Sequence, residues 1–349
     1  MPPNYDAISA SPVQPAASAD SEASWLNQTD IRVIKWHPEG ENGLRMALVD
    51  YTGVNGLLKC TRNVDQHNNE VMALQKLQYN FHTLEVLFVP EILDIFQAND
   101  GYHCLILEVI KGYSLREYIS MIPEYLRDAV TYKFATTLSS AIYFVHTSNF
   151  THGNINPDTI YFRSNDRNDA LELVLTGFEG SQSLTDLPQT SIVKPKDFTP
   201  PEDFIESKVD QRKRDAWMVG ATLYFMTNGH PPYGFAYSKK HKAVLPVPTK
   251  ELKETMVRVA TIGDKLYAPI ETKNTLLLHE MEWLLAPKPQ NRHYAEKIAL
   301  DGILDAIEYT PTNTALLKVW NKLKSKLPII GTPRWQAEPP RLKGKDVSM

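Results

Sequence analysis

The chain has 349 residues, of which 42% are hydrophobic, so it is long enough to bury a large core and too apolar to be disordered throughout. Its 37 Lys and Arg nearly balance its 41 Asp and Glu, and the net charge of −4 gives no reason to expect nucleic acid as a partner. Apolar runs stay shorter than the roughly eighteen residues that a transmembrane helix needs, so we expect no membrane span.

The two cysteines, Cys60 and Cys104, are too few for a disulfide framework or a thiolate zinc site. Each lies in an apolar run, so we interpret both as buried free thiols in a reducing compartment. Residues 1–20 contain neither the basic nor the apolar stretch of a secretory signal. These observations predict a cytoplasmic protein.

Short β-type patterns dominate the first third of the chain. Residues 1–24 precede them and are rich in Pro, Ala and Ser, which predicts a disordered segment. A helical pattern over 67–78 interrupts the β-type runs. The runs cover 31–36, 44–51, 56–60, 86–89 and 103–109.

Helical patterns dominate after Val109, and a strand-rich part followed by a helical part predicts an α+β fold. The end of the chain, 312–349, combines an apolar helical face with basic side chains and a Pro-rich tail. It predicts a helix packed on the domain or, alternatively, a basic helix that contacts a partner or an acidic membrane surface. The earlier helical patterns cover 114–120, 125–148, 215–229 and 275–286.

Residues 215–234, DAWMVGATLYFMTNGHPPYG, resemble the D-x-W-x-x-G helix of protein kinases and the G-x-P-P-[FY] turn that follows it. Asp215, Trp217 and Gly220 match the helix position for position. In that family the aspartate accepts hydrogen bonds from the backbone of the catalytic loop, so the resemblance implies a scaffold role for Asp215.

Other landmarks of the family occur in its order along the chain. TPPEDF at 199–204 resembles A-P-E, and Arg292 matches the arginine that closes the large lobe. The resemblance therefore implies a buried ion pair between Glu202 and Arg292. HGNINPDTIYF at 152–162 resembles the catalytic loop H-R-D-L-K-P-x-N, and GFE at 177–179 stands where D-F-G belongs.

The resemblance covers about residues 30–308. It implies the bilobal protein kinase-like fold, with a small β-rich lobe over about 30–110 and a larger helical lobe over about 111–308. The residues that match structural positions of the family are His152, Phe178, Glu202, Asp215, Trp217, Gly220 and Arg292.

The positions that carry phosphoryl transfer in the family are replaced. The catalytic aspartate is Asn154, an amide with no useful basicity, and loss of a general base costs about 10²–10⁴ in rate. The phosphate-contacting lysine is Asn156, one Mg²⁺-holding residue is Thr159, and the aspartate of D-F-G is Gly177. Glu179 follows closely but requires a shifted backbone to serve. These replacements predict no catalytic residue and no metal site.

Three other carboxylates lie near this region. Asp158 matches a variable position that faces outward in the family, and Asp166 and Asp169 are typical of a solvated turn. They would be recruited only by a rearranged site.

Lys59 and Glu70 match the pair that holds the α- and β-phosphates in active relatives. Their separation of eleven residues is short, which implies a truncated loop or helix. Leu107 matches the gatekeeper, and Glu108 and Ile110 match the hinge that follows it. These five residues are candidates for weak ATP binding without Mg²⁺. Alternatively the Lys59–Glu70 pair only joins a strand to a helix, and no cofactor is required.

Two loops that handle phosphate are also altered. The glycine-rich loop keeps only Gly40 and Gly43, and fewer glycines allow fewer backbone N–H groups to approach a phosphate. Gly153 replaces the arginine that reads phosphorylation of the activation segment, so a phosphorylation switch of the usual form is not expected.

The structural positions are retained while the chemical ones are lost, which predicts a catalytically inactive kinase-like domain, a pseudokinase. We expect it to act as a scaffold or allosteric partner of an active kinase, a receptor or another signalling protein. Two alternatives stay open: a weak or divergent ATP-dependent kinase, and a nucleotide-binding sensor without turnover.

Overall fold

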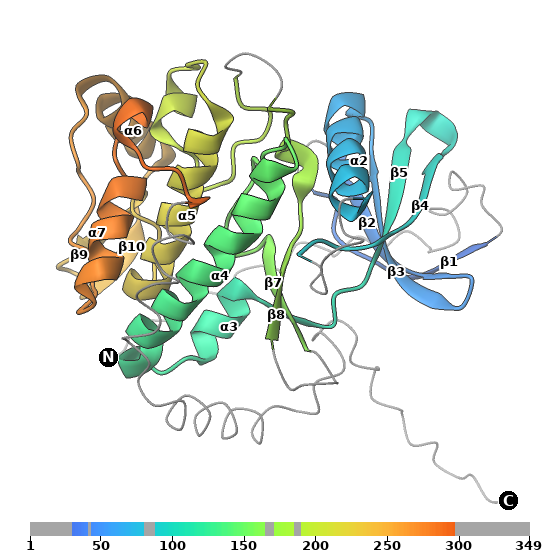
Figure 1. Cartoon of the computed structure of the whole chain (residues 1–349), viewed down its shortest axis with the longest axis horizontal. Coiled ribbons are helices and arrows are strands. Elements are labelled where there is room, and N and C mark those ends of the chain that lie inside the picture. Colours follow the sequence, from blue (N-terminus) through green and yellow to red (C-terminus); the bar gives the residue numbers. More distant parts are fainter. Residues whose placement is uncertain (1–29, 41–42, 80–87, 165–170, 185–189, 297–349) are drawn as a thin grey trace, which may run out of the picture.

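The structure is a computed structural model of the whole chain and describes residues 30–40, 43–79, 88–164, 171–184 and 190–296 (Figure 1). A small lobe of strands and one helix lies beside a larger helical lobe in the described residues, so the expected α+β, bilobal arrangement is confirmed. The segments 1–24 and 312–349 lie outside the described residues, and what was expected of them stays a prediction.

The small lobe is built on a five-stranded antiparallel sheet in the order β1-β2-β3-β5-β4. Strand β3 alternates along its length, with Leu58 and Cys60 buried on one face and Lys59 on the other. The strands are β1 (Ile31–Trp36), β2 (Arg45–Tyr51), β3 (Val54–Thr61), β4 (Ile92–Gln97) and β5 (His103–Glu108).

Four of the five predicted β-type runs are confirmed; in the run over 86–89, residues 86 and 87 lie outside the described residues, and residues 88 and 89 form no strand. Val89 is instead buried in the core, and the backbone carbonyl of Phe88 accepts a hydrogen bond from Leu175. The strand of this region is β4, whose polar Asp94 interrupts the apolar run that would have revealed it. Pairing with β5 forms β4.

Helix α2 (Val64–Tyr79) packs on the sheet and confirms the helical pattern over 67–78. Its buried Leu74 and Leu77 belong to the same core cluster as Leu105 and Leu107 of β5. The helix is therefore held by apolar contacts, while its polar residues are left to face the space between the lobes or solvent.

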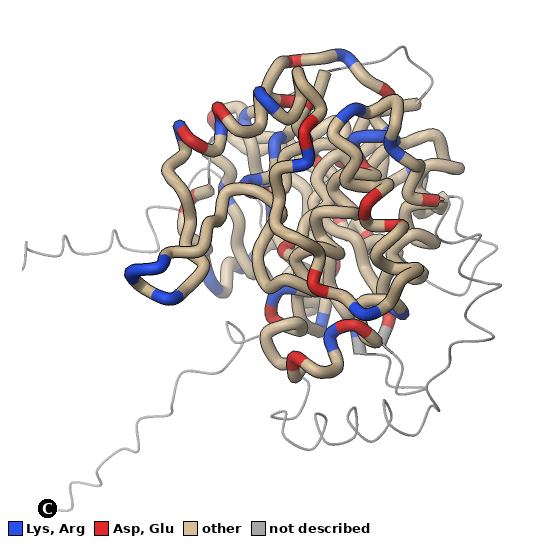
Figure 2. Tube along the Cα trace, turned by 90° about the vertical axis from the view of Figure 1, so that its left-hand side faces the viewer, with Lys and Arg blue, Asp and Glu red and all other residues tan. Residues whose placement is uncertain are grey.

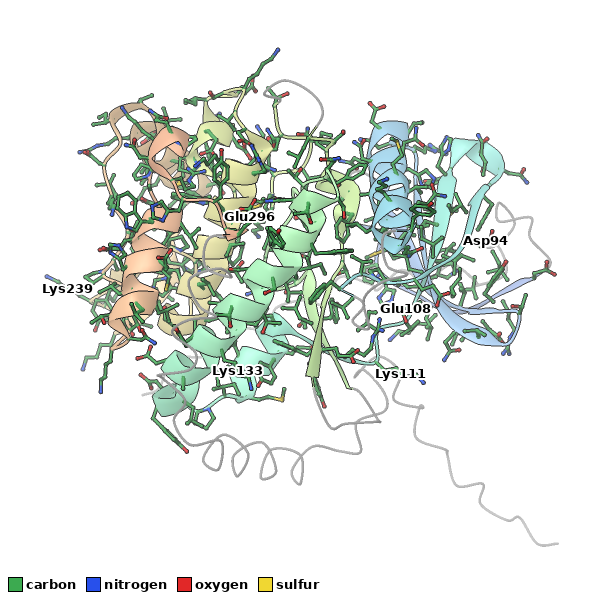
Figure 3. All side chains as sticks on the ribbon, in the orientation of Figure 1. Asp94, Glu108, Lys111, Lys133, Lys239 and Glu296 are labelled. Atoms are coloured by element: carbon green, nitrogen blue, oxygen red, sulfur yellow. A yellow bond between two sulfur atoms is a disulfide. The ribbon has the colours of Figure 1, made fainter. Side chains whose placement is uncertain are left out.

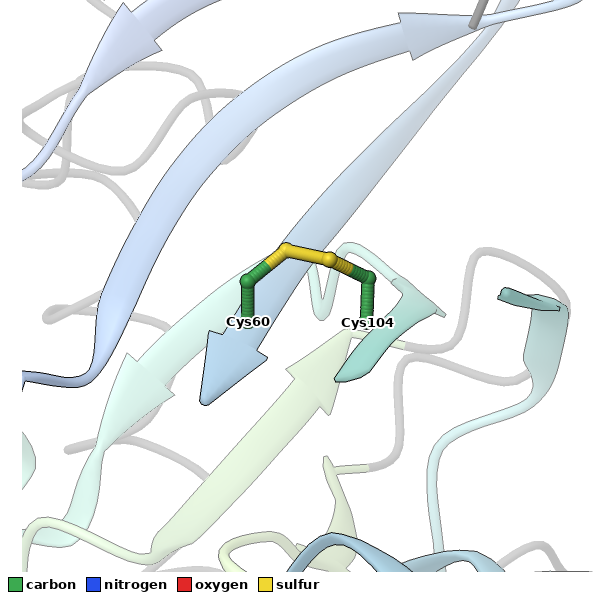
Figure 4. Close-up of a disulfide and its surroundings, with 2 residues drawn as sticks. All are labelled: Cys60 and Cys104. Carbon is green, nitrogen blue, oxygen red and sulfur yellow. A yellow bond between two sulfur atoms is a disulfide. The ribbon is translucent and has the colours of Figure 1, made fainter. Parts of the chain in front are cut away.

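Cys60 and Cys104 form a disulfide (Figure 4). They face each other in the register of β3 and β5, with their Cα atoms 4.2 Å apart. The interpretation as free thiols is wrong, because pairing of two strands brings together cysteines that are 44 residues apart in the chain. The inference of a reducing compartment thereby loses its basis.

Within the described residues, the large lobe combines five α-helices with a three-stranded sheet, β6-β7-β8 (Gly112–Ser114, Ile160–Ser164 and Leu171–Leu175). A separate hairpin pairs β9 (Phe235–Ser238) with β10 (Ala243–Pro246). The helices are α3 (Leu115–Met121), α4 (Arg127–Thr147), α5 (Gln211–Asn228), α6 (Thr249–Ile262) and α7 (Thr275–Leu284). The four helical patterns predicted after Val109 are confirmed, and α6 and the hairpin were not predicted.

Helix α5 is the central element of the large lobe, since nearly all of its side chains are buried. The side chain of Asp210 accepts a hydrogen bond from the backbone N–H of Arg212 at its start, and Gly229 ends it with a φ of 78°. Gly220 lies so close to α7 that an added Cβ would be 2.8 Å from Cβ of Leu284. This packing fixes the N-terminal turns of α5 beneath the loop that contains residues 152–159.

Basic and acidic residues are interspersed over the described chain (Figure 2). Their mixing agrees with the nearly balanced composition. None of the helices in the described residues has the length and apolarity needed to cross a membrane.

Candidate active site

Lys59 and Glu70 lie where the sheet of the small lobe meets α2. Lys59 Nζ is 2.7 Å from Glu70 Oε1 and 2.8 Å from Oε2, and the two side chains are only 11% and 6% exposed. The short spacing is absorbed by the connection, because β3 ends at Thr61 and α2 begins at Val64. Of the two alternatives left open by the sequence, the truncated loop is therefore the correct one.

Glu179 reaches this pair from the large lobe. Its Oε2 is 3.2 Å from Lys59 Nζ, and its Oε1 accepts a hydrogen bond of 2.9 Å from Asn154 Nδ2. Gly177 has a φ of 77° and leads into the 3₁₀ helix η5 (Phe178–Gly180), which carries Glu179. Glycine at 177 and glutamate at 179 together place a carboxylate between Lys59 and the catalytic loop.

The charges of these three groups depend on one another. Burial raises the pKa of Glu70, and the charge of Lys59 offsets this only in part. Burial also acts to raise the pKa of Glu179, but the charge of Lys59 together with hydrogen bonds from the backbone and from Lys59 outweighs it, and the pKa is lowered. For Lys59, burial lowers the pKa, but Glu179 and Glu70 together raise it above its ordinary value. Glu179 and Lys59 are therefore both ionised at neutral pH.

The catalytic loop is held by Asp215, as the resemblance implied. The buried carboxylate accepts hydrogen bonds of 2.8 Å from the backbone N–H groups of both His152 and Gly153. Its Oδ2 also lies 2.9 Å from Nε2 of His146, whose Nδ1 is 2.7 Å from Oε1 of Glu296, beside α4 (Figure 3). The sequence analysis missed His146 and Glu296, which are 150 residues apart and share no local pattern.

The three replaced positions of the catalytic loop form one polar network. Asn156 Nδ2 donates to Asn154 Oδ1 over 3.1 Å, and the hydroxyl of Thr159 donates to the backbone carbonyl of Asn154 over 2.8 Å. Since Asn154 also donates to Glu179, its side chain is held at the inner end of the loop. The network fixes Asn154 where a hydroxyl of a substrate would approach in an active relative.

Phe178 and Leu107 are buried, and Glu108 forms an ion pair. The buried ring of Phe178 lies 4.4 Å from that of His152. Leu107 is buried and pairs with Leu57 across β5 and β3. The carboxylate of Glu108, in the connection between the lobes (Figure 3), pairs with Arg163 and accepts from the backbone N–H of Glu91.

Ile110 and the two glycines of the glycine-rich loop are the remaining residues of the expected nucleotide region. Ile110 is half-buried between β5 and β6. Gly43 adopts a φ of 73°, and the backbone N–H of Gly40 donates to the carbonyl of Leu44 over 2.8 Å, in the part of the chain between β1 and β2.

The expected ion pair between Glu202 and Arg292 is present and buried. Arg292 Nη1 and Nη2 donate to the two carboxylate oxygens of Glu202 over 2.7 and 3.0 Å. The guanidinium also lies 5.0 Å from the ring of Trp217, which stacks on Tyr233. This cluster closes the large lobe around α5.

The other nearby carboxylates stay away from the site. Asp158 pairs with Arg116 over 2.7 and 2.8 Å at the surface, in keeping with an outward-facing position. Asp166 and Asp169 lie outside the described residues. Within the described ranges, no cluster of three or more His, Cys, Asp and Glu side chains could hold a metal ion.

Comparison with known sequences decides the family. The protein kinase domain family matches residues 54–301, which is more than half of the chain. The chain belongs to the protein kinase domain family.

Relatives within the family are distant and longer. A calcium/calmodulin-dependent serine/threonine-protein kinase of Malus domestica is 27% identical over 177 residues, covering 50% of this chain and 40% of that protein. Serine/threonine-protein kinase ULK3 of Xenopus laevis is 28% identical over 198 residues, covering 56% of this chain and 41% of that protein. The part of this chain that aligns with these two relatives spans about two fifths of their length.

A solved structure, the Cydia pomonella granulovirus kinase PK-1, superposes with a TM-score of 0.57 at 15% identity. It covers 80% of this chain and 96% of that one. At this identity the likeness shows the fold alone.

The expectation that this protein is not an enzyme is contradicted. The family that matches is the protein kinase domain, and the relatives carry the names of serine/threonine kinases. Asn154, Thr159 and Gly177 stand where the family has its catalytic aspartate and its Mg²⁺-holding residues, and the chain still belongs to this family of enzymes.

Proposed function

We propose that this protein is a divergent ATP-dependent protein kinase of low turnover, with Lys59, Glu70 and Glu179 handling the nucleotide. The contact between Glu179 and the Lys59–Glu70 pair supports the proposal most. A pair that only joined β3 to α2 would need no charged group from the other lobe. Glu179, the third charged group, links the Lys59–Glu70 pair to the catalytic loop, as phosphoryl transfer between the lobes requires.

Phosphoryl transfer depends mainly on positioning and on electrostatic stabilisation, so the loss of one base slows it without forbidding it. Lys59 is the residue that would hold the α- and β-phosphates, and Asn154 would orient the substrate hydroxyl by a hydrogen bond without removing its proton. A lost base costs about 10²–10⁴ in rate. From a typical kinase turnover of about 1–100 s⁻¹, a rate of roughly 10⁻⁴–1 s⁻¹ remains.

Protein kinases use Mg²⁺ to neutralise charge on the phosphates. Mg²⁺ is held by one or two carboxylates together with phosphate oxygens, and the carboxylate of Glu179 would be the protein ligand of one such ion. This assignment replaces the two family ligands that Thr159 and Gly177 cannot supply. ATP binding without Mg²⁺, in which Lys59 alone supplies the positive charge, is the competing proposal.

The substrate, the partners and the location are also proposals. The relatives named serine/threonine kinases support a serine or threonine hydroxyl on a protein as acceptor. A protein partner in signalling agrees with this role, whereas the disulfide between Cys60 and Cys104 removes support from the cytoplasmic location expected from the sequence.

The proposal is tested by transfer of labelled γ-phosphate from ATP with Mg²⁺ to the protein itself and to casein. Transfer is expected from the wild type and is expected to fall below detection in Lys59→Met. The matched control is Lys133→Met, which removes a lysine exposed on α4. Absence of transfer from the wild type, or equal transfer by Lys59→Met, would overturn the proposal; binding of ATP without transfer would favour a nucleotide sensor.

A further inference from the structure

Arg214 is a buried arginine of α5 that neither the family landmarks nor the nucleotide site accounts for. Its side chain is 1% exposed and pairs with Asp203, which is 2% exposed. Arg214 Nε lies 3.0 and 2.8 Å from the two carboxylate oxygens of Asp203. A buried, multiply bonded pair of this kind is strong and geometrically specific.

The same guanidinium bonds two further segments. Nη1 donates to the backbone carbonyl of Gly153 in the catalytic loop over 3.0 Å, and Nη2 donates to the carbonyl of Val193. Asp203 lies in η6 (Pro201–Phe204), at the end of the segment that begins at Gly177, here named the activation segment. One side chain therefore ties the catalytic loop to the middle and the end of the activation segment.

Gly153 leaves the catalytic loop without a side chain that could make these contacts, which Arg214 makes from α5. In relatives the residue at this position of the catalytic loop is an arginine that binds a phosphorylated residue and so orders the activation segment. Here a Cβ at Gly153 would lie 1.9 Å from the carbonyl oxygen of Gly180, and φ is 75°. The two backbones are in direct contact, so no side chain fits at 153.

Other contacts run along the same junction. The backbone N–H of Thr151 donates to the carbonyl of Gln182 over 2.9 Å, and that of Leu184 donates to Asn149 over 2.8 Å. Lys194 Nζ donates to the carbonyl of Asp203 over 3.0 Å. The start of the activation segment is thus bonded along the catalytic loop, and Arg214 extends the attachment to residues 193–203.

We infer that Arg214 is a positioning residue that holds residues 193–203 of the activation segment in place, with the Asp203 carboxylate supplying a fixed negative charge where relatives depend on phosphorylation. The inference rests on the proposed kinase function for its effect on transfer. It implies that the segment is ordered, and transfer proceeds, without phosphorylation of the protein.

Hydrogen exchange of the full chain after phosphatase treatment tests the anchor independently of activity. Backbone amides of 190–204 are expected to be protected in the wild type and to exchange about 10²-fold faster in Asp203→Asn, because an unpaired buried charge is strongly destabilising. Arg214→Lys keeps the positive charge but loses the planar guanidinium that donates several hydrogen bonds at once, so partial protection of the same amides is expected. The control is Arg258→Met, which removes an exposed pair with Asp264.

Protection of 190–204 that is unchanged in Asp203→Asn and Arg214→Lys, or absent from the dephosphorylated wild type, overturns the inference. In a transfer assay, kcat is expected to fall about tenfold or more in Arg214→Lys while the ATP-dependent rise in melting temperature is kept. A role in stability alone would lower the melting temperature and leave kcat unchanged. If the variants lose protection of 190–204 while the wild type never transfers phosphate, the anchoring role of Arg214 is supported and the kinase proposal is rejected.

Discussion

Lys59 Nζ and Glu179 Oε2 lie 3.2 Å apart, although 120 residues separate them in the chain. Lys59 belongs to β3 of the small lobe, and Glu179 to η5 at the start of the activation segment. The contact joins the two lobes at the place where the family holds the phosphates of ATP. If Glu179 also holds Mg²⁺, its charge decides how the protein responds to nucleotide with and without metal.

Glu179→Gln is expected to abolish the effect of Mg²⁺ on ATP binding. In the wild type, ATP with Mg²⁺ at a hundredfold excess over Kd should stabilise the fold by about 2.7 kcal/mol, and EDTA should reduce this gain. In the variant, ATP should stabilise equally with Mg²⁺ and with EDTA, as measured by thermal unfolding. Glu254→Gln, an exposed position of α6, serves as control. A wild-type gain that is the same in EDTA would instead favour metal-free binding.

Glu202→Gln is expected to destabilise the large lobe by about 3–5 kcal/mol, because Arg292 would keep a buried charge without its counterion. Urea unfolding measures the change. The control is Asp264→Asn, since Asp264 pairs with Arg258 at the surface and such pairs contribute about 0–1 kcal/mol. Equal effects of the two substitutions would show that the pair with Arg292 is not buried as described.

Stability is expected to fall as the pH rises through the alkaline range. Burial acts to lower the pKa of His146, but the hydrogen bonds with Asp215 and Glu296 outweigh it and raise the pKa from 6.5 to about 9. A raised pKa gives stability that is complete below about 6.5 and is lost as the pH passes 9, on the order of 3 kcal/mol. Urea unfolding between pH 6 and 10 measures it.

His146→Gln is the matched control for this pH dependence, since it removes the titrating group. The loss of stability between pH 6.5 and 9 should be much smaller in the variant. A wild-type stability that is flat over this range would contradict the charged state of His146.

Reduction of the disulfide between Cys60 and Cys104 is expected to destabilise the small lobe. The bond closes a loop of 44 residues, for which chain entropy predicts about 4 kcal/mol. Urea unfolding with and without dithiothreitol measures the difference. The double variant Cys60→Ala, Cys104→Ala should be unaffected by dithiothreitol; an unaffected wild type would show that the bond contributes nothing to stability.

Elements with regular apolar periodicity could be predicted from the sequence. Helices α4, α5 and α7 and strands β1, β2, β3 and β5 follow their patterns because each buries one face at least in part or is buried throughout. Helix α6 could also have been found, since Leu252, Met256 and Val259 recur at helical spacing and are buried or half-buried. Strand β10 could not, because all four of its residues are exposed and only pairing with β9 forms it.

Long-range pairs were predictable only where a family motif named both partners. Glu202 and Arg292 were paired on that basis, and Asp215 was placed beneath the catalytic loop. The pair of Arg214 with Asp203 has no such motif, because the fold alone brings these residues together. Glu179 was set aside because it lies two residues after the position of the family's aspartate, and the sequence does not reveal that its side chain reaches Lys59 and Asn154.

The central claim is that phosphate is transferred at this site and that Asn154 limits the rate. The most direct measurement is the initial rate of labelled γ-phosphate transfer with Mg²⁺, for the wild type beside Asn154→Asp. We predict a slow, measurable rate in the wild type and a rate about 10² higher in the variant, because the new carboxylate supplies a general base. No transfer by either protein would contradict the claim that this chain is an active, divergent kinase.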